Sequence, residues 1–322
     1  MYNLLRNFKK GGTDMTVTEY TGRELILPAK TEMALGFFDG VHVGHRDIIK
    51  GVVESAKKCG HIPAVFTFSA GAGSLKSGVT RIYSDENKLA IFESLGVELA
   101  IIADFDALKG LSPEEFATRV LISDLKCAVA HFGFDFRFGK GAAGDADMLT
   151  ELMIKNGARA VVYEERQRNG VKLSSTAIRV ALSEGRAEDA AEMLGEPFFV
   201  CGKVEKGLGK GRTWGIPTVN LPLPKDSALK SGVYLTRVDS ENFQGYAITN
   251  VGVCPTVETR ETHLEGYILD FEGDLYEKQV KLSFISYIRE ERLFKNTDEL
   301  ASQIRKDEAK AREIIKDTGD KK

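Results

Sequence analysis

The sequence predicts a two-part protein of α/β plus β class, in which a doubly wound parallel sheet precedes an antiparallel barrel or sandwich. Two patterns predict this division. Between residues 30 and 163, short apolar runs alternate with amphipathic stretches, and such alternation is typical of a parallel sheet with helices on both faces. Between residues 198 and 287, short segments rich in β-branched and aromatic residues are separated by turn residues, which is typical of antiparallel structure.

Five strands and several helices are expected in the first part. The strands carry few charges, as do strands buried on both faces, and they span residues 33–36, 64–68, 99–102, 127–130 and 160–163. The first helix is predicted from apolar residues that share one face, namely Ile48, Ile49, Val52, Val53 and Ala56. Another begins at the capping box of Ser112 and Glu115, with Pro113 at the first helical position. A third is expected over 147–156, before Gly157.

The second part is expected to follow two short helices between residues 174 and 195, with Pro197 as a boundary. Its predicted strands span 198–204, 232–238, 244–251, 264–271 and 279–287. A last helix begins at the capping box of Asn296 and Glu299 and carries one apolar stripe, formed by Leu300, Ile304, Ala311 and Ile315. We therefore expect a flexible extension over 1–14, then domains over 15–183 and 197–322, joined by a linker helix over 184–196.

Composition narrows the class of protein. The 322 residues suffice for two cores, and 43% apolar with 28% charged residues is the balance of a soluble globular protein. A net charge of −3 gives no drive toward nucleic acid or anionic membrane. No apolar run is long enough for a transmembrane helix, and the four cysteines form no C-x-x-C pair, so neither a disulfide framework nor structural zinc is expected. We expect a cytoplasmic protein, whose start could be Met1 or Met15.

One candidate site lies between the first strand and the first helix. Residues 36–45 read G-F-F-D-G-V-H-V-G-H. The glycines allow a tight turn, and the helix that follows presents free N–H groups to an anion. His42 and His45 could donate hydrogen bonds to phosphate oxygens and stabilise charge on a transferring group. A metal site is not favoured here, because the pair would need further ligands and the chain has only five histidines.

A second candidate site lies at residues 202–220, which hold five glycines and four basic residues. A flexible, basic loop of this kind can wrap phosphates with its N–H groups. The stretch is not a Walker A motif, which needs G-x-x-x-x-G-K-[ST].

Taken in order along the chain, these motifs resemble those of the bifunctional prokaryotic riboflavin kinase/FAD synthetase family. Residues 36–45 resemble its G-x-F-D-G-x-H-x-G-H signature, and residues 133–139 and 174–179 resemble its second and third nucleotide motifs. The resemblance implies a Rossmann-like nucleotidyltransferase domain over 15–183 with His42 and His45 as catalytic residues. At its ATP/FMN site the resemblance places Gly36, Phe37, Asp39, Gly40, Asp135, Gly139, Ser174, Ser175, Thr176 and Arg179.

The second part resembles the family's riboflavin kinase domain, an antiparallel β-barrel with a terminal helix. Residues 202–220 resemble G-x-V-x-x-G-x-x-x-G-R-x-x-G-x-P-T-A-N, with Val219 in place of alanine. The resemblance implies that Thr218 and Asn220 hold Mg²⁺ and that Glu265 is the catalytic base. Its ATP/phosphate residues would be Gly207, Gly209, Lys210, Gly211, Arg212 and Asn250, and its flavin-binding residues Arg289, Glu291 and Phe294. Tyr267 replaces a histidine of the family's L-E-x-H-x-L-D-F motif.

The resemblance thus implies two reactions, from riboflavin and ATP to FMN and from FMN and ATP to FAD. ATP would bind with Mg²⁺, FMN and FAD would be products rather than redox cofactors, and no nucleic acid or membrane partner is expected. One motif departs from the family: residues 67–72 read T-F-S-A-G-A where the family has T-F-x-P-H-P. The alternative is therefore a kinase-only protein whose first domain has lost or weakened FAD synthesis.

Two other classes of protein remain as alternatives. A different nucleotidyltransferase is disfavoured by the β-rich second part, and a non-enzymatic flavin-binding protein is conceivable for the first part alone. The oligomeric state stays open.

Overall fold

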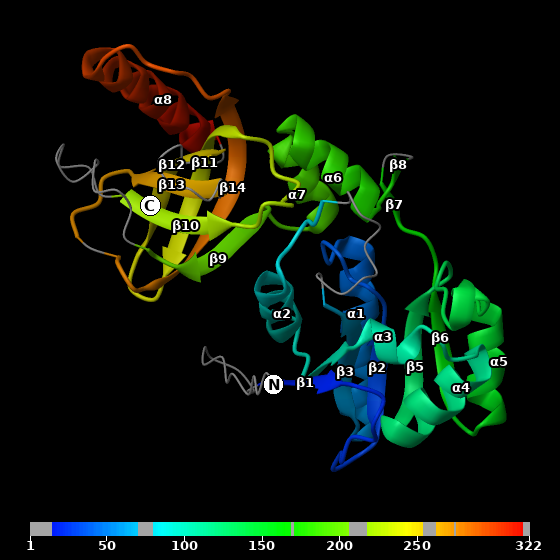
Figure 1. Cartoon of the computed structure of the whole chain (residues 1–322). Coiled ribbons are helices and arrows are strands. Elements are labelled where there is room, and N and C mark those ends of the chain that lie inside the picture. The colour runs from blue at the N-terminus through cyan, green and yellow to red at the C-terminus, as the bar shows by residue number, and fades with distance from the viewer. Residues whose placement is uncertain are drawn as a thin grey trace. The chain divides into compact units, whose positions relative to one another are not determined.

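The computed structural model describes residues 15–69, 80–168, 171–205, 218–253, 262–273 and 275–317. The chain forms two compact units (Figure 1). The first unit comprises Met1–Val79 and Tyr83–Ser175, and the second comprises Thr80–Ile82 and Thr176–Lys322. The domain limits expected from the sequence, at 183/184 and 196/197, stay a prediction, because a compact unit need not coincide with a domain.

The first unit is built on a six-stranded sheet in the order β1-β4-β3-β2-β5-β6, with every neighbouring pair parallel. The strands are β1 Thr16–Tyr20, β2 Thr31–Leu35, β3 Ile62–Phe68, β4 Leu99–Ala103, β5 Cys127–Gly133 and β6 Arg159–Tyr163. The chain runs from β2 toward β3 and β4 on one side, and returns to β5 and β6 on the other. The sheet therefore has a switch point at the carboxyl end of β2, where open α/β sheets bind ligands.

Helices cover this sheet (Figure 1). They are α1 Val43–Cys59, α2 Asp85–Ser94, α3 Phe105–Leu108, α4 Pro113–Glu115 and α5 Ala146–Lys155, with a π-helix at Phe116–Asp124 and a 3₁₀ turn at Lys140–Ala142. The predicted inner face of α1 is confirmed, since the same five residues are its buried ones. The predicted capping box is confirmed too: Ser112 and Glu115 exchange backbone-to-side-chain hydrogen bonds of 2.8 and 3.1 Å.

Three expectations for the first unit need correction. The sequence pattern does not predict β1, which adds an edge strand beside β4. The expectation that all strands are buried on both faces is wrong for β6, because that strand forms the other edge and exposes Val161 and Val162. The short pair β7 Gln167–Arg168 and β8 Val171–Lys172 is also absent from the predicted elements.

The second unit contains a six-stranded antiparallel sheet in the order β10-β13-β12-β11-β14-β9. Its strands are β9 Phe199–Lys203, β10 Thr218–Leu223, β11 Gly232–Ser240, β12 Gln244–Val253, β13 Thr262–Ile268 and β14 Gln279–Arg289. The two edge strands approach each other, with the Glu205 N–H donating to the Asn220 carbonyl at 2.9 Å. The sheet thus curls into a nearly closed barrel, as the fold class predicts. β10 is a strand that the sequence pattern does not predict.

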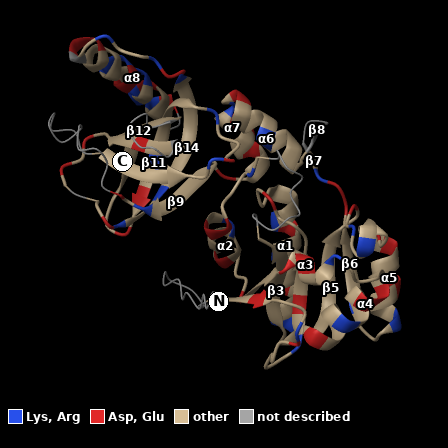
Figure 2. Ribbon diagram, in the orientation of Figure 1, with Lys and Arg blue, Asp and Glu red and all other residues tan. Residues whose placement is uncertain are grey.

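Three helices complete this part of the chain. The predicted short helices are confirmed as α6 Ser175–Glu184, which begins at the last residue of the first unit, and α7 Ala187–Leu194. The predicted terminal helix is α8 Thr297–Asp317, and Asn296 caps it by accepting from the Glu299 N–H at 2.9 Å. Ala311 of α8 is buried in one cluster with Val233, Leu235, Ile248 and Ile288 of the sheet and with Leu269, which follows β13. The rest of α8 carries charges of both signs (Figure 2). No helix in the described part of the chain has the length and apolarity that crossing a membrane requires.

Candidate active sites

The loop between β2 and α1 has an unusual backbone. Phe38 and Val41 have φ angles of 52° and 40° and are buried, and Gly40 has a φ of 82°. A positive φ is rare for bulky residues and persists only where the surroundings hold it. The Phe38 ring covers Gly36, where an added Cβ would lie 3.0 Å from that ring. The loop is also tied down by Ser175, whose Oγ donates to the Asp39 carbonyl at 2.6 Å.

The two predicted histidines lie together at the start of α1. His42 is the N-cap residue, and its Nδ1 accepts from the His45 N–H at 3.4 Å. The two rings are stacked, with centroids 3.6 Å apart, and the Phe38 ring meets His45 edge-on at 5.2 Å. Burial lowers the pKa of His42 to about 4 and the pKa of His45 well below its ordinary value. Both imidazoles are therefore neutral near pH 7.

His45 has spare hydrogen-bonding capacity. Its Nδ1 is buried and has no hydrogen-bond partner among the described residues. A buried polar atom without a partner is uncommon in folded proteins and often marks a ligand or catalytic position. The free N–H groups at the start of α1 add a second feature that favours an anion.

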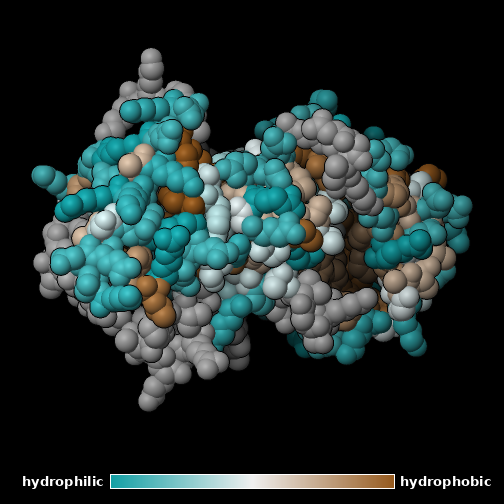
Figure 3. Space-filling view, turned by 90° about the horizontal axis from the view of Figure 1, so that it is seen from above, coloured by the Kyte–Doolittle hydropathy of each residue, from teal (hydrophilic) through white to brown (hydrophobic). Residues whose placement is uncertain are grey.

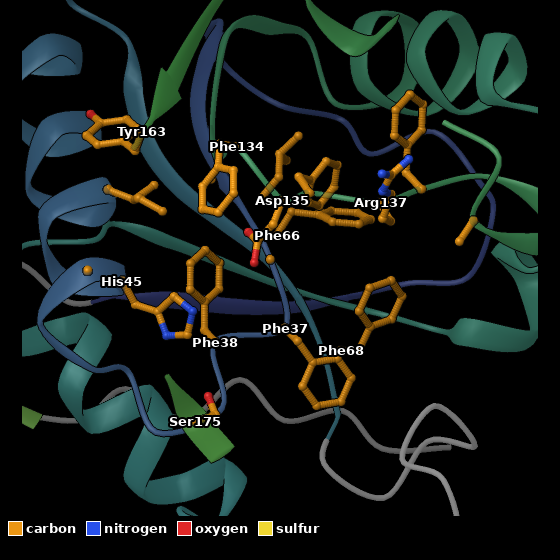
Figure 4. Close-up of a pocket in the computed structure, with 18 of the residues that line it drawn as sticks. Phe37, Phe38, His45, Phe66, Phe68, Phe134, Asp135, Arg137, Tyr163 and Ser175 are labelled. Atoms are coloured by element: carbon orange, nitrogen blue, oxygen red, sulfur yellow. The ribbon is translucent and has the colours of Figure 1, made fainter. Parts of the chain in front are cut away.

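These histidines border a cavity of about 700 Å³. Its walls are largely aromatic, with Phe37, Phe38, Phe66, Phe68, Phe105, Phe116, Phe134, Phe136 and Phe138 among the lining residues. Phe37 and Phe68 lie nearly parallel, 6.1 Å between ring centroids (Figure 4). The hydrophobic hollow is visible in the space-filling view (Figure 3). A cavity of this size with aromatic walls and a few polar groups suits a ligand with flat rings.

Most residues predicted for the first site line this one cavity: Gly36, Phe37, His42, His45, Asp135, Gly139, Ser174 and Ser175. Asp39 and Gly40 belong to the loop beside it. Thr176 and Arg179 fall in the second unit, where Arg179 Nε donates to the Thr80 carbonyl at 2.7 Å.

Two lining residues, Tyr163 and Arg166, lie outside the motifs that the sequence matched. Phe68, Phe134 and Arg137 also line the cavity; they lie within the matched motifs at 67–72 and 133–139 but were not among the predicted site residues. Arg166, in contrast, approaches only through the fold, with its Nε 2.7 Å from Asp47 Oδ2 of α1.

The segment that resembles the family's T-F-x-P-H-P motif begins at the end of β3, where Phe68 lines the cavity. Thr67 Oγ1 donates to the Phe37 carbonyl at 2.9 Å, and Lys88 Nζ of α2 donates to the Phe68 carbonyl at 2.8 Å. Lys88 is buried; desolvation lowers its pKa, and Asp85 and Asp39 oppose that effect. Residues 70–72 of the motif lie outside the described residues. The buried ammonium group of Lys88 therefore holds the end of β3 in place through the Phe68 carbonyl.

The second candidate site is a row of residues that crosses three strands. Asn220 of β10 lies opposite Glu265 of β13, and Glu265 lies opposite Asn250 of β12. Cross-strand partners share one face of a sheet, so the predicted base lies between the two predicted amides. Thr218 is two residues from Asn220 and shares this face, with its Oγ1 3.5 Å from Asn220 Nδ2. Glu265 is exposed.

Of the predicted flavin-binding residues, Glu291 reaches this row. Glu291 Oε1 accepts from Asn250 Nδ2 at 3.0 Å. Gly252 makes this contact feasible, because a Cβ there would overlap the Glu291 carboxylate. The Phe294 ring lies near Arg289, 5.8 Å from its guanidinium carbon.

Arg289 itself is already engaged. Its Nε and Nη2 donate to Asp307 of α8 at 2.8 to 3.1 Å. The structure therefore gives Arg289 a role in holding α8, and its contact with flavin stays a prediction. Gly207, Gly209, Lys210, Gly211 and Arg212 lie outside the described residues.

The two departures in this unit are accommodated by packing. Val219 is fully buried and faces away from Thr218 and Asn220; its Cγ2 would lie 2.9 Å from a Cβ at Gly266. It therefore fills the space that this glycine leaves inside the barrel. Tyr267 packs against the cluster that joins α8 to the sheet.

Both parts of the chain match known families. A family model described as FAD synthetase matches residues 27–177, and one described as riboflavin kinase matches residues 194–315. The "Bifunctional riboflavin kinase/FMN adenylyltransferase" of Escherichia coli (strain K12) is 33% identical over 290 residues, which is 88% of this chain and 92% of that protein. The protein of the same description from Bacillus subtilis (strain 168) is 34% identical over 295 residues, with the same shares covered.

A solved structure reproduces the fold along most of the chain. It is described as a macrolide-efflux protein from Streptococcus pneumoniae, and it is similar with a TM-score of 0.76 and 26% identity, covering 92% of this chain and 98% of its own. Two family models in succession, and relatives above 30% identity over nearly their whole length, show that this chain belongs to the bifunctional riboflavin kinase/FMN adenylyltransferase family.

Proposed function

We propose that the second unit phosphorylates riboflavin with ATP to give FMN and ADP, and that the first unit joins FMN and ATP to give FAD and diphosphate. The observation that carries the proposal is the row of Asn220, Glu265 and Asn250 across three neighbouring strands. It combines a carboxylate with amide and hydroxyl groups on one exposed face, and residues far apart in the sequence supply it.

In the kinase reaction, ATP enters with Mg²⁺. A hydroxyl oxygen and an amide oxygen suit this hard cation, which keeps phosphate and water ligands as well. Thr218 and Asn220 provide these two groups side by side, and a half-turn of the amide about χ2 directs Oδ1 toward the Thr218 hydroxyl. Glu265 accepts the proton of the riboflavin 5′-hydroxyl while the hydroxyl oxygen bonds to the γ-phosphorus, and ADP leaves.

In the adenylyltransferase reaction, an FMN phosphate oxygen bonds to the α-phosphorus of ATP and diphosphate leaves. His42 and His45 are neutral donors at the start of α1, so each can give a hydrogen bond to the developing negative charge. The aromatic cavity accommodates flat rings beside them.

Incubation of the full chain with riboflavin, ATP and Mg²⁺, followed by chromatography of the flavins, tests the proposal. We expect FMN first and FAD later. FMN without FAD would restrict the protein to the kinase reaction, as the departure at residues 70–72 allows. A lack of both products would overturn the proposal.

A further inference from the structure

A second polar cluster lies in the first unit, between the sheet and α1, and neither proposed reaction uses it. At its centre is Glu32 of β2, whose side chain has no exposed surface. Burial favours the neutral acid, but the polar side chains of Ser55, His61 and His131 outweigh it and lower the pKa of Glu32. A buried carboxylate is costly unless it is hydrogen-bonded or bound by a cation.

Two side chains of metal-binding type, both near the C-terminal end of α1, lie beside Glu32 of β2. Cys59 is the last residue of α1, and His61 precedes β3. The ligand atoms of Glu32, Cys59 and His61 all lie within 4.8 Å of one another. His61 Nδ1 lies 2.9 Å from Glu32 Oε1. Carboxylate, thiolate and imidazole together form a ligand set that suits Zn²⁺ and related ions rather than Mg²⁺.

A fourth residue marks the cluster independently. His131 of β5 is buried, and its Nε2 lies 3.4 Å from Glu32 Oε2. Within the described part of the chain, neither atom has a partner with hydrogen-bond geometry. The other ring nitrogen, Nδ1, lies 3.1 Å from the Tyr163 hydroxyl. Two buried polar atoms thus face the cluster with unused capacity, next to three ligand atoms.

We propose that Glu32, Cys59 and His61 bind a divalent first-row transition ion such as Zn²⁺, with His131 supporting the carboxylate. Ligand atoms around tetrahedral Zn²⁺ lie about 3.5 Å apart. The distances between the three ligand atoms, which are at most 4.8 Å, would therefore shorten by roughly 1 Å when the ion binds. Cys59 is exposed and ends its helix, and its Sγ accepts from Arg159 Nη2 at 3.9 Å, a surface contact that the thiolate gives up when it moves toward the ion. The partly exposed His61 leaves the fourth position open to water.

Charge and position agree with this assignment. The thiolate and the carboxylate together balance the charge of a divalent ion. His131 Nε2 lies 3.4 Å from the free carboxylate oxygen, a position from which many metal sites support a ligating carboxylate. The bound ion would join the end of α1 to β2 and β3, at the opposite end of the helix from His42 and His45.

Co²⁺ titration of the full chain, freed of metal by a chelator, tests the site. We expect one equivalent of Co²⁺ to bind with a thiolate charge-transfer band in the near ultraviolet, and Zn²⁺ to remove that band. Cys59→Ser should abolish the band, whereas Cys201→Ser, which changes a thiol of β9 in the other unit, should keep it. His131→Ala should weaken Co²⁺ binding about 10- to 100-fold without removing the band.

Two outcomes would overturn the proposal: no thiolate band in the unmodified chain, or an equal band in Cys59→Ser. Because Cys59 is exposed, its replacement leaves the core intact, and circular dichroism checks that the variant is folded. None of these measurements depends on flavin or ATP turnover.

Discussion

In the first unit the candidate site is assembled from loops that follow parallel strands, whereas in the second it lies on the strands themselves. The cavity residues of the first unit come mainly from segments after β2, β3 and β5, near the switch point of the sheet. The row of the second unit comes from the register of β10, β13 and β12. One site is an aromatic cavity that opens to the surface; the other is a polar face of the sheet.

This difference explains why the two sites depend on different features. In a parallel sheet the loops are free to vary, and short contiguous motifs with glycines and strained residues position the catalytic groups. On a barrel face, strand pairing fixes the spacing of side chains, so a site survives only if register is kept. We therefore expect substitutions in the two units to have separable effects.

Replacing Glu265 should produce the largest difference between the two activities. Glu265→Gln keeps the shape of the side chain but cannot accept the hydroxyl proton, so we expect FMN formation to fall by about 10²- to 10⁴-fold. FAD formation from supplied FMN should be unchanged, and riboflavin binding should persist. Rates of both reactions by chromatography measure this. Glu241→Gln, an exposed carboxylate of the turn before β12, is the control. Unchanged FMN formation in Glu265→Gln would remove the assignment of the base.

Replacing His45 should give the reciprocal result. His45→Gln removes an imidazole whose Nδ1 is buried and unpaired among the described residues, and loss of one donor to a developing charge typically lowers a rate by about 10²- to 10³-fold. We expect FAD formation from FMN to fall by this factor, while FMN formation from riboflavin serves as the internal control. Equal loss of both activities would indicate general damage to the chain instead.

A third substitution tests how α8 is held against the sheet of the second unit. In Asp307→Asn, Arg289 loses one of the two Asp307 oxygens that accept its hydrogen bonds, and also the opposite charge on this nearly buried side chain. Breaking such a pair destabilises by about 3 kcal/mol, so α8 should separate from the sheet at lower urea concentration. Circular dichroism in urea measures the shift. Asp298→Asn, exposed on the same helix, should have little effect; similar midpoints for the two variants would contradict the role of the pair.

The smallest effect concerns acid sensitivity of the first unit. The pKa of His42 is about 4 in the folded chain, against an ordinary value of 6.5. Between these values the unfolded chain binds a proton that the folded chain does not, so this group destabilises the unit as pH falls from 6.5 to 4. His42→Asn keeps an N-cap acceptor but does not titrate. We expect its thermal midpoint to fall less than that of the unmodified chain between about pH 7 and pH 5; an equal fall would refute the prediction.

The sequence by itself determined the local features. The inner face of α1, the capping box at Ser112, the N-cap at Asn296, and the succession of parallel and antiparallel parts all follow from short-range periodicity and end signals. The resemblance further named residues that the structure places together, such as Thr218, Asn220 and Asn250. The local features are readable because each depends on neighbours within a few positions.

Only the tertiary structure decided the rest. β1 is a strand because it pairs with β4, and β10, whose apolar residues alternate but which contains Pro222, because it pairs with β13. Tertiary packing likewise brings Asp307 into hydrogen-bond contact with Arg289. It also brings together side chains from separate elements, namely Glu32, Cys59, His61 and His131. Pairing register and helix packing create these contacts between distant segments, and no spacing along a single chain encodes which distant groups will meet.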